Sequence, residues 1–374
     1  MWFTNCVAIS TKCTFRYVLT LAKEAMQIDW GEADAVLDGT REHLFVFCTL
    51  LAYSCAPFAV CFHKANTEAF REGLHLAFQF FGCVPRRVIW GNAKVTVKSG
   101  AGKQAIPQET YAAFAAHYCF QMDLCNVRSG NEKGLVENLV GTIRRNTLSP
   151  VPHVASLEAL NQRIAETCTQ YIRTHRIANR QRSVAEMFTE DQSRLSPLPQ
   201  IPYDFRKVEI CRISSCSTAR FQTNNYSVPV LYARREATVR ASAEKVEIYV
   251  DGQIVANHKR CYKHHQSIYS LAHYLPLLER RPCSILQAQP VKQNLSGKLL
   301  SLLESTRLPA KRFIAVLKYC AENGETVFWQ HRNEFMGRNS EKPKIENPIN
   351  VQDVDLSLYD SFLMDGGASC RLQG

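Results

Sequence analysis

Near the start of the chain lies an apolar stretch with strand character, AMQIDWGEADAVL (Ala25–Leu37), and one carboxylate, Asp29, stands inside its apolar first half. Two similar runs follow, His43–Ser54 and Pro57–His63, and Asp38-Gly39 marks a tight turn after the first. The pattern predicts three consecutive strands. An unpaired charge within an apolar strand is costly, so Asp29 indicates a functional site unless it lies on an edge strand and faces solvent.

Helical and strand patterns alternate after these runs. We expect a helix from Asn66 to about Phe81, a short strand Val84–Trp90, a polar loop Gly91–Gln108, a helix Glu109–His117, a strand Tyr118–Leu124, and amphipathic helices at about Glu132–Asn146 and Ser156–His175. The order of these elements predicts one mixed α/β domain that extends to about residue 190.

A proline-rich joint at Pro197, Pro199 and Pro202 precedes five or six short alternating segments. One pair of them flanks Asp251-Gly252, a strong signal for a tight hairpin. Short strands in this number predict a small β-barrel. We therefore expect an unmatched segment 1–24, an α/β domain 25–190, a barrel 203–262, and a helical C-terminal region 263–374 with a helix at Pro309–Asn323 and a polar, acidic, poorly ordered tail.

Charge and composition narrow the class of partner. The chain has 374 residues and a formal net charge of +11, which favours an anionic partner, nucleic acid before a membrane surface. Its 15 cysteines are scattered through apolar runs without C-x-x-C spacing, as in a cytosolic protein with reduced thiols. No apolar run predicts a transmembrane helix or a signal peptide.

A second carboxylate, Glu137, lies on the expected helix near residue 132, off its apolar stripe and in line with Lys133 and Arg144. It is either an ordinary solvated glutamate paired with Lys133 or a ligand of a hard divalent cation, which prefers carboxylate oxygens. A site with two such cations needs several carboxylates. Between Asp29 and Glu137 the expected strand Val84–Trp90 ends in Gly91, which has no side-chain ligand.

Three motifs carry a family resemblance: QIDWGE (Gln27–Glu32), VIWGNAK (Val88–Lys94) and GNEKGLVEN (Gly130–Asn138). With these motifs the chain resembles the IstA class of bacterial insertion-sequence transposases, in the retroviral-integrase-like DDE superfamily. The similarity extends from about Ala25 to about Ser361. It implies an RNase H-like integrase catalytic core followed by a small β-barrel that contacts DNA.

The resemblance also implies roles for single residues. Asp29 would be the first catalytic carboxylate and Glu137 the third, and both would bind Mg²⁺. The family has an aspartate at the position of Gly91. The implied reaction is hydrolysis at the ends of a mobile element, followed by strand transfer to target DNA. The implied partners are DNA, further copies of the chain and an ATP-binding helper protein, in the bacterial cytoplasm and without a membrane.

Two departures from the family pattern suggest impaired activity. Loss of one of three ligands at Gly91 should cost on the order of 10³-fold or more in rate; Asp123 is the nearest candidate substitute in the sequence. The family's N-terminal DNA-binding segments have no counterpart before Ala25, so we expect a truncated, decayed copy. The alternatives are a catalytically dead DNA-binding or oligomerising remnant, and a product without any role.

Basic residues supply candidate DNA contacts, which as solvated surface charges would look much the same. They are Lys94, Lys98 and Lys103 in the loop after Trp90, Lys133, Arg144 and Arg145 around Glu137, and Arg234, Arg235, Lys259 and Arg260 in the expected barrel. The run Cys261–His265 is only a weak metal-binding motif, and its composition favours a basic loop. The chain has no Walker loop, so we expect no use of ATP by the chain itself.

Overall fold

The computed structural model describes residues 24–90, 97–99, 106–107, 109–124, 141, 147–177, 181–281, 285–306 and 308–336, with the backbone alone at 97–99, 106–107 and 124. Its central sheet begins with the antiparallel strands β1 (Ala25–Leu37), β2 (Thr40–Leu51) and β3 (Pro57–Phe62). Asp38 and Gly39 join the first two with φ of 47° and 77°. Both values are left-handed, as a two-residue hairpin turn requires, so the predicted turn is confirmed.

Two parallel strands complete this sheet on the other side of β1. They are β5 (Arg87–Trp90) and β8 (Gln121–Leu124), and the strand order is β3-β2-β1-β5-β8. The short β9 (His153–Val154) also pairs with β1. The strand predicted at Val84–Trp90 is in fact two strands, because Pro85 interrupts it: β4 (Cys83–Val84) pairs with β10 (Ser196–Pro197) outside the central sheet. The strands β6 (Val97–Ser99) and β7 (Ile106–Pro107) pair with each other.

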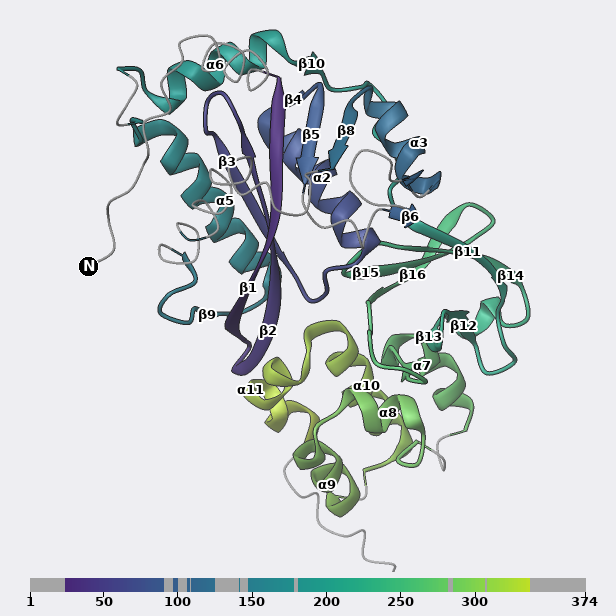
Figure 1. Ribbon diagram of the computed structural model, residues 1–374. Coiled ribbons are helices and arrows are strands. Elements are labelled where there is room, and N and C mark those ends of the chain that lie inside the picture. The colour runs from purple at the N-terminus through teal and green to yellow at the C-terminus, as the bar shows by residue number, and fades with distance from the viewer. Residues whose placement is uncertain are drawn as a thin grey trace, which may run out of the picture. The chain divides into compact units, whose positions relative to one another are not determined.

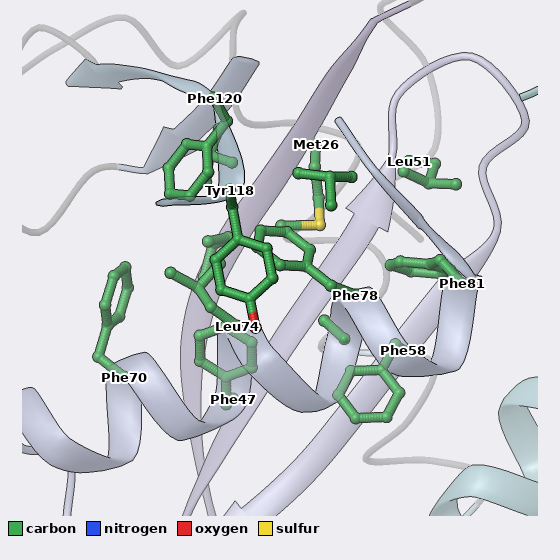
Figure 2. Packing of buried hydrophobic residues seen from close by; sticks show 14 of the residues in the cluster. Met26, Phe47, Leu51, Phe58, Phe70, Leu74, Phe78, Phe81, Tyr118 and Phe120 are labelled. Atoms are coloured by element: carbon green, nitrogen blue, oxygen red, sulfur yellow. The ribbon is translucent and has the colours of Figure 1, made fainter. Parts of the chain in front are cut away.

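Helices cover both faces of the central sheet (Figure 1). On one face lie α2 (Thr67–Phe81) and α3 (Glu109–Tyr118). The side chain of Asn66 caps α2 by accepting a hydrogen bond from the Ala69 amide at 2.8 Å, and Gly82 ends the helix with φ of 70°. Figure 2 shows that the apolar side of α2 lies on the sheet. Its core residues there include Phe70, Leu74 and Phe78, which are buried with Phe47.

The opposite face is covered by α5 (Leu157–Thr174), for which Ser156 is the predicted cap and accepts from the Ala159 amide. Its buried side chains Leu160, Ile164 and Cys168 pack on the β1–β3 part of the sheet. A further helix, α6 (Val184–Arg194), begins at a capping box of Ser183 and Glu186. These elements confirm the predicted mixed α/β architecture.

The predicted barrel region contains two sheets on a common core, one of them antiparallel and the other with antiparallel β12 and β13 and with β17 parallel to β13. One sheet, which we call the second sheet, has the order β11-β14-β15-β16. The other has the order β12-β13-β17. The strands are β11 (Lys207–Arg212), β12 (Thr218–Phe221), β13 (Asn224–Ser227), β14 (Glu236–Ala241), β15 (Lys245–Val250), β16 (Gln253–Lys259) and β17 (Ser267–Ile268). Asp251 and Gly252 form the predicted hairpin turn, with φ of 50° and 78°. Over 203–262 no closed barrel is detected, so the barrel prediction is not confirmed.

Helices follow β17 in the chain. They are α7 (Leu271–Arg280), α8 (Gln289–Asn294), α9 (Gly297–Thr306), α10 (Ala310–Asn323) and α11 (Glu325–Met336). The chain divides into two compact units, Met1–Asn294 and Leu295–Gly374, so the boundary expected at 263 falls inside the first unit. The predicted helix Pro309–Asn323 corresponds to α10. None of the helices described is long and apolar enough to cross a membrane.

Candidate active site

Asp29 lies in the middle strand of the central sheet, with neighbours on both sides. It pairs with Cys48 of β2 in the antiparallel register and is partly exposed. The preceding residue, Ile28, is buried against α2, so alternation places the Asp29 side chain on the opposite face of the sheet. The alternative interpretation, an aspartate on an edge strand, is disfavoured because β1 lies between β2 and β5, with its pairing to β5 ending at Ile28.

Asp29 lies one residue beyond the part of β1 that pairs in parallel with β5. Ile28 pairs with Trp90, the last residue of β5, and Trp90 pairs with Leu124, the last residue of β8. Consecutive Cα atoms lie about 3.8 Å apart, and adjacent strands about 4.8 Å apart. Position 91 directly follows Trp90, as Asp29 directly follows Ile28. Asp29 thus lies close to the carboxyl end of β5.

Buried thiols lie on the same face as Asp29. Burial raises the pKa of the Cys48 thiol well above its usual value, and Cys61, Cys168 and the Asp29 carboxylate add to the effect. A thiol with so high a pKa stays neutral at pH 7 and is unreactive. Ten cysteines are described and none forms a disulfide, in agreement with the expected reduced thiols. Neutral thiols therefore lie on the side of the sheet that Asp29 shares with Cys48.

Asp123 is already engaged by another side chain. The Arg87 Nε donates a hydrogen bond to Asp123 Oδ2 at 2.6 Å, and an Arg87 Nη makes a shorter contact with the same oxygen. Asp123 pairs with Ile89, one position before the strand ends. Its carboxylate is neutralised by a neighbouring strand, which disfavours Asp123 as a substitute for the ligand missing at Gly91.

Several predicted site residues lie outside the described residues. They are Gly91, Glu137, Lys94, Lys103, Lys133, Arg144 and Arg145, and of Lys98 only the backbone in β6 is described. Within the part of the chain that is described, no three His, Cys, Asp or Glu side chains are grouped to hold a metal. In the loop Cys261–His265, the Nδ1 of His264 lies 3.3 Å from the hydroxyl of Thr223.

The four basic residues predicted in the second sheet do not form one patch. Arg234 and Arg235 directly precede β14 and are exposed, and Arg235 forms an ion pair with Asp251. Lys259 ends β16, at the opposite end of the sheet, where it pairs with Lys245 of β15. The two groups are separated by the length of a six-residue strand, about 20 Å.

Arg260 is buried, which corrects its prediction as a DNA contact. Its side chain is 2% exposed and forms an ion pair with Glu68 of α2 at 3.6 Å. One Nη donates to the Ser242 carbonyl at 2.7 Å, and the guanidinium lies 4.8 Å from the centre of the Tyr262 ring. A guanidinium with these partners holds two parts of the protein together and is not available to a phosphate.

The sequence analysis missed Lys245, which faces Lys259 directly across the hairpin. A two-residue turn at Asp251-Gly252 pairs Val250 with Gln253, but a β-bulge between Ile248 and Tyr249 shifts the register by one residue. The shift places two exposed lysines opposite each other, an arrangement that destabilises a sheet unless an anion lies nearby. The hairpin signal was visible in the sequence, whereas the bulge was not.

The chain is similar in sequence to several known proteins. Residues 198–270 match the family model of the Mu transposase C-terminal domain. The chain is 32% identical over 273 residues to a transposase of Aminobacter aminovorans, covering 71% of this chain and 54% of the relative. It is 30% identical over 273 residues to the transposase for insertion sequences IS1326/IS1353 of Pseudomonas aeruginosa, again covering 71% and 54%.

Over these 273 residues the chain is similar to transposases of bacterial insertion sequences. The chain spans about half the length of these curated relatives. Among solved structures, it is similar to the catalytic core domain of HTLV-2 integrase in complex with magnesium, with 12% identity, a TM-score of 0.32, and coverage of 44% of this chain and 96% of that one.

Proposed function

We propose that this chain derives from an enzyme that cuts and joins DNA during transposition, with an RNase H-like catalytic core. The observation that supports the proposal is the parallel register of β1 and β5, in which Ile28 pairs with Trp90, the residues directly before Asp29 and position 91. Ligands in α/β sheets bind at the carboxyl ends of parallel strands, and Asp29 lies near the carboxyl end of β5. The relatives named as transposases support the same reaction class.

The donor atoms only partly suit Mg²⁺. Asp29 offers a partly exposed carboxylate, and Glu137 would offer a second, in agreement with the preference of Mg²⁺ for oxygen ligands. Gly91 offers none. When bound in a complete site of this kind, Mg²⁺ activates the attacking water or 3′-hydroxyl and stabilises the leaving oxygen. We therefore propose that the residues present hold the metal too weakly for normal catalysis.

DNA would also contact the second sheet. Arg234 and Arg235 are exposed beside β14, and Lys245 and Lys259 are exposed at its other end. The match to the Mu transposase C-terminal domain covers all four residues. The two sheets share one buried core, which is compatible with a small barrel-like fold. Further proposed contacts are Lys94, Lys98, Lys103, Lys133, Arg144 and Arg145, with oligomer formation and an ATP-binding helper protein as the remaining proposed partners.

The second candidate function is a catalytically dead protein that binds DNA or joins the oligomer of an active transposase. Gly91 favours this alternative, because glycine cannot supply a carboxylate. The fold and the exposed basic residues that DNA binding needs are retained.

A strand-transfer assay separates the two candidates. The chain and its Gly91→Asp variant, each joined to the N-terminal segment of the Aminobacter relative, are incubated with Mg²⁺ and DNA that carries the element's ends. We expect joined products from the Asp variant only, with a rate difference on the order of 10³-fold or more. Equal activity of both proteins would show that another group supplies the ligand. Inactivity of both, with retained DNA binding, would favour the dead protein.

A further inference from the structure

His63 lies between two carboxylates that come from different parts of the fold. It follows β3, and its Nε2 lies 2.8 Å from Oε2 of Glu42 on β2. Its Nδ1 lies 2.5 Å from Oε2 of Glu244, in the turn between β14 and β15. The side chains of His63 and Glu244 are only 17% and 15% exposed. The proposed DNA chemistry does not use any of these three residues.

This geometry favours a protonated histidine. A neutral imidazole carries a single N–H, so its second nitrogen presents a lone pair. With a carboxylate oxygen within 2.8 Å of each nitrogen, that lone pair would face a negative charge. Nδ1 is hydrogen-bonded to Glu244, whereas Nε2 is buried, makes no hydrogen bond to any described residue and pairs with Glu42 through charge. Deprotonation therefore removes the positive charge that both carboxylates face.

The same turn is attached to the α/β sheet by further hydrogen bonds. The His63 amide donates to Oε1 of Glu244 at 2.9 Å. The Ala243 amide donates to Oε2 of Glu72 on α2 at 2.7 Å, and the Tyr262 hydroxyl donates to the Ala243 carbonyl at 2.5 Å. The turn is thus the place where the second sheet is held against β3 and α2, and Glu244 bridges it to His63 with both carboxylate oxygens.

Charges on the surrounding elements act in both directions. The hydrogen bond that His63 donates to Glu244 is the largest influence and raises the pKa of His63, while burial lowers it. The charges of Glu244 and Glu42 favour the protonated form and Lys259 on β16 opposes it, so the net result is a raised pKa. Glu158 on α5 faces Lys245 and Lys259. Burial raises the pKa of the Glu72 carboxyl to about 6.

We propose that Glu42, His63 and Glu244 form a protonation-controlled latch that fixes the β14–β15 turn, and with it the second sheet, to the α/β sheet and releases it as the pH rises. The sign follows from linkage. A histidine whose pKa is higher in the folded state than its ordinary value of 6.5 stabilises fully below that value. The stabilisation is lost as the pH rises through the folded pKa. The inference is independent of the proposed DNA chemistry.

Amide hydrogen exchange in the full chain tests the latch. The readout is the protection factor of the His63 amide, corrected for intrinsic exchange, between about pH 6 and pH 9. We expect it to fall by about tenfold or more across this range. In a His63→Gln variant the protection should be low throughout and independent of pH. A profile in His63→Gln that matches the unmodified protein would overturn the proposal.

The chain offers a matched control. His43 also lies between two carboxylates, at 3.0 Å from Asp34 and 3.6 Å from Glu32, but it is 54% exposed and contacts only the β1–β2 hairpin. His43→Gln should leave the profile at His63 unchanged, and a loss of the profile in this variant would count against the latch. If His63→Gln does not fold, Glu42→Gln keeps the imidazole and should move the fall in protection to lower pH. An unmoved profile in that variant contradicts the proposal.

Discussion

Ile28 of β1 and Trp90 of β5 pair across two parallel strands, and Trp90 is the last residue of β5. Asp29 therefore lies one residue beyond the part of β1 that pairs with β5. In the proposed metal site, position 91 carries a glycine in place of the second carboxylate, so one substitution, Gly91→Asp, tests the assignment of Asp29.

Gly91→Asp should increase metal affinity. A second carboxylate beside Asp29 should lower the Kd for Mn²⁺ or Mg²⁺ by about tenfold or more, because affinity for hard cations rises with the number of charged oxygen ligands. Isothermal titration calorimetry of the full chain measures the effect. Gly91→Asn is a control of similar size without the charge, and Asp29→Asn in the Gly91→Asp background should abolish the gain. Equal affinities of the Asp and Asn variants would contradict the assignment of Asp29.

Gly73→Ala should destabilise the protein although alanine favours helices. A Cβ at Gly73 in α2 would lie 2.8 Å from Cγ of Phe47, whose ring is fully buried. The ring cannot move without disturbing the core, so we expect a loss of about 1–3 kcal/mol in the free energy of unfolding. Gly297→Ala is the control, since a Cβ there meets nothing within 4 Å. Denaturant unfolding measures both variants, and we expect a neutral or stabilising effect for Gly297→Ala. Equal effects of the two variants would contradict the clash.

Asp191 should make stability decrease as the pH rises. Its side chain is buried and accepts a hydrogen bond from the Ser54 amide at 3.2 Å. Burial raises its pKa from 3.8 to about 6, so the folded state binds the proton more tightly than the unfolded state. Stability due to this group is present below pH 3.8 and is lost as the pH rises to about 6.

Asp191→Asn removes the titration and keeps an acceptor for Ser54. The free energy of unfolding of Asp191→Asn, relative to that of the unmodified chain, should therefore be higher at about pH 7 than at about pH 4, by up to about 3 kcal/mol. Urea unfolding at both pH values measures this difference. A difference of zero would mean that Asp191 titrates normally in the folded protein.

Arg260 and Arg235 should give opposite phenotypes. Arg260→Ala leaves Glu68 buried without its cation, so we expect a loss of about 2–4 kcal/mol in stability. Arg235→Ala should leave stability within about 0.5 kcal/mol, but it should weaken DNA binding and lower the slope of log K against log salt by about one. Fluorescence anisotropy at several salt concentrations provides the second measurement. An unchanged salt slope in Arg235→Ala would remove this residue from the proposed DNA contacts.

Local sequence patterns were sufficient for most single elements. Alternation predicted β1 with its observed bounds, and the two Asp-Gly pairs predicted turns whose φ values are positive at both residues. The caps Asn66 and Ser156 marked the starts of α2 and α5. The single strand predicted at Val84–Trp90 was wrong, because Pro85 interrupts it. Its first part, β4, pairs with β10, a segment more than one hundred residues away.

The candidate site was predicted less evenly. Asp29 was visible as a charge within an apolar run, and its pairing partners then placed it in the middle of the sheet. Arg260 was predicted as a surface charge because a basic residue after a strand usually faces solvent. Its burial depends on Glu68 and Tyr262, and no local pattern shows that contact.

The sequence by itself determined where strands, turns and helix caps form, because these depend on residues within a few positions of one another. It also determined that position 91 carries no carboxylate. The tertiary structure alone decided that Ile28 pairs with Trp90, that a bulge sets Lys245 opposite Lys259, and that Glu42 and Glu244 meet on His63. Each of these relationships joins residues distant in the chain, and only the packing of strands and helices against a common core brings such residues together.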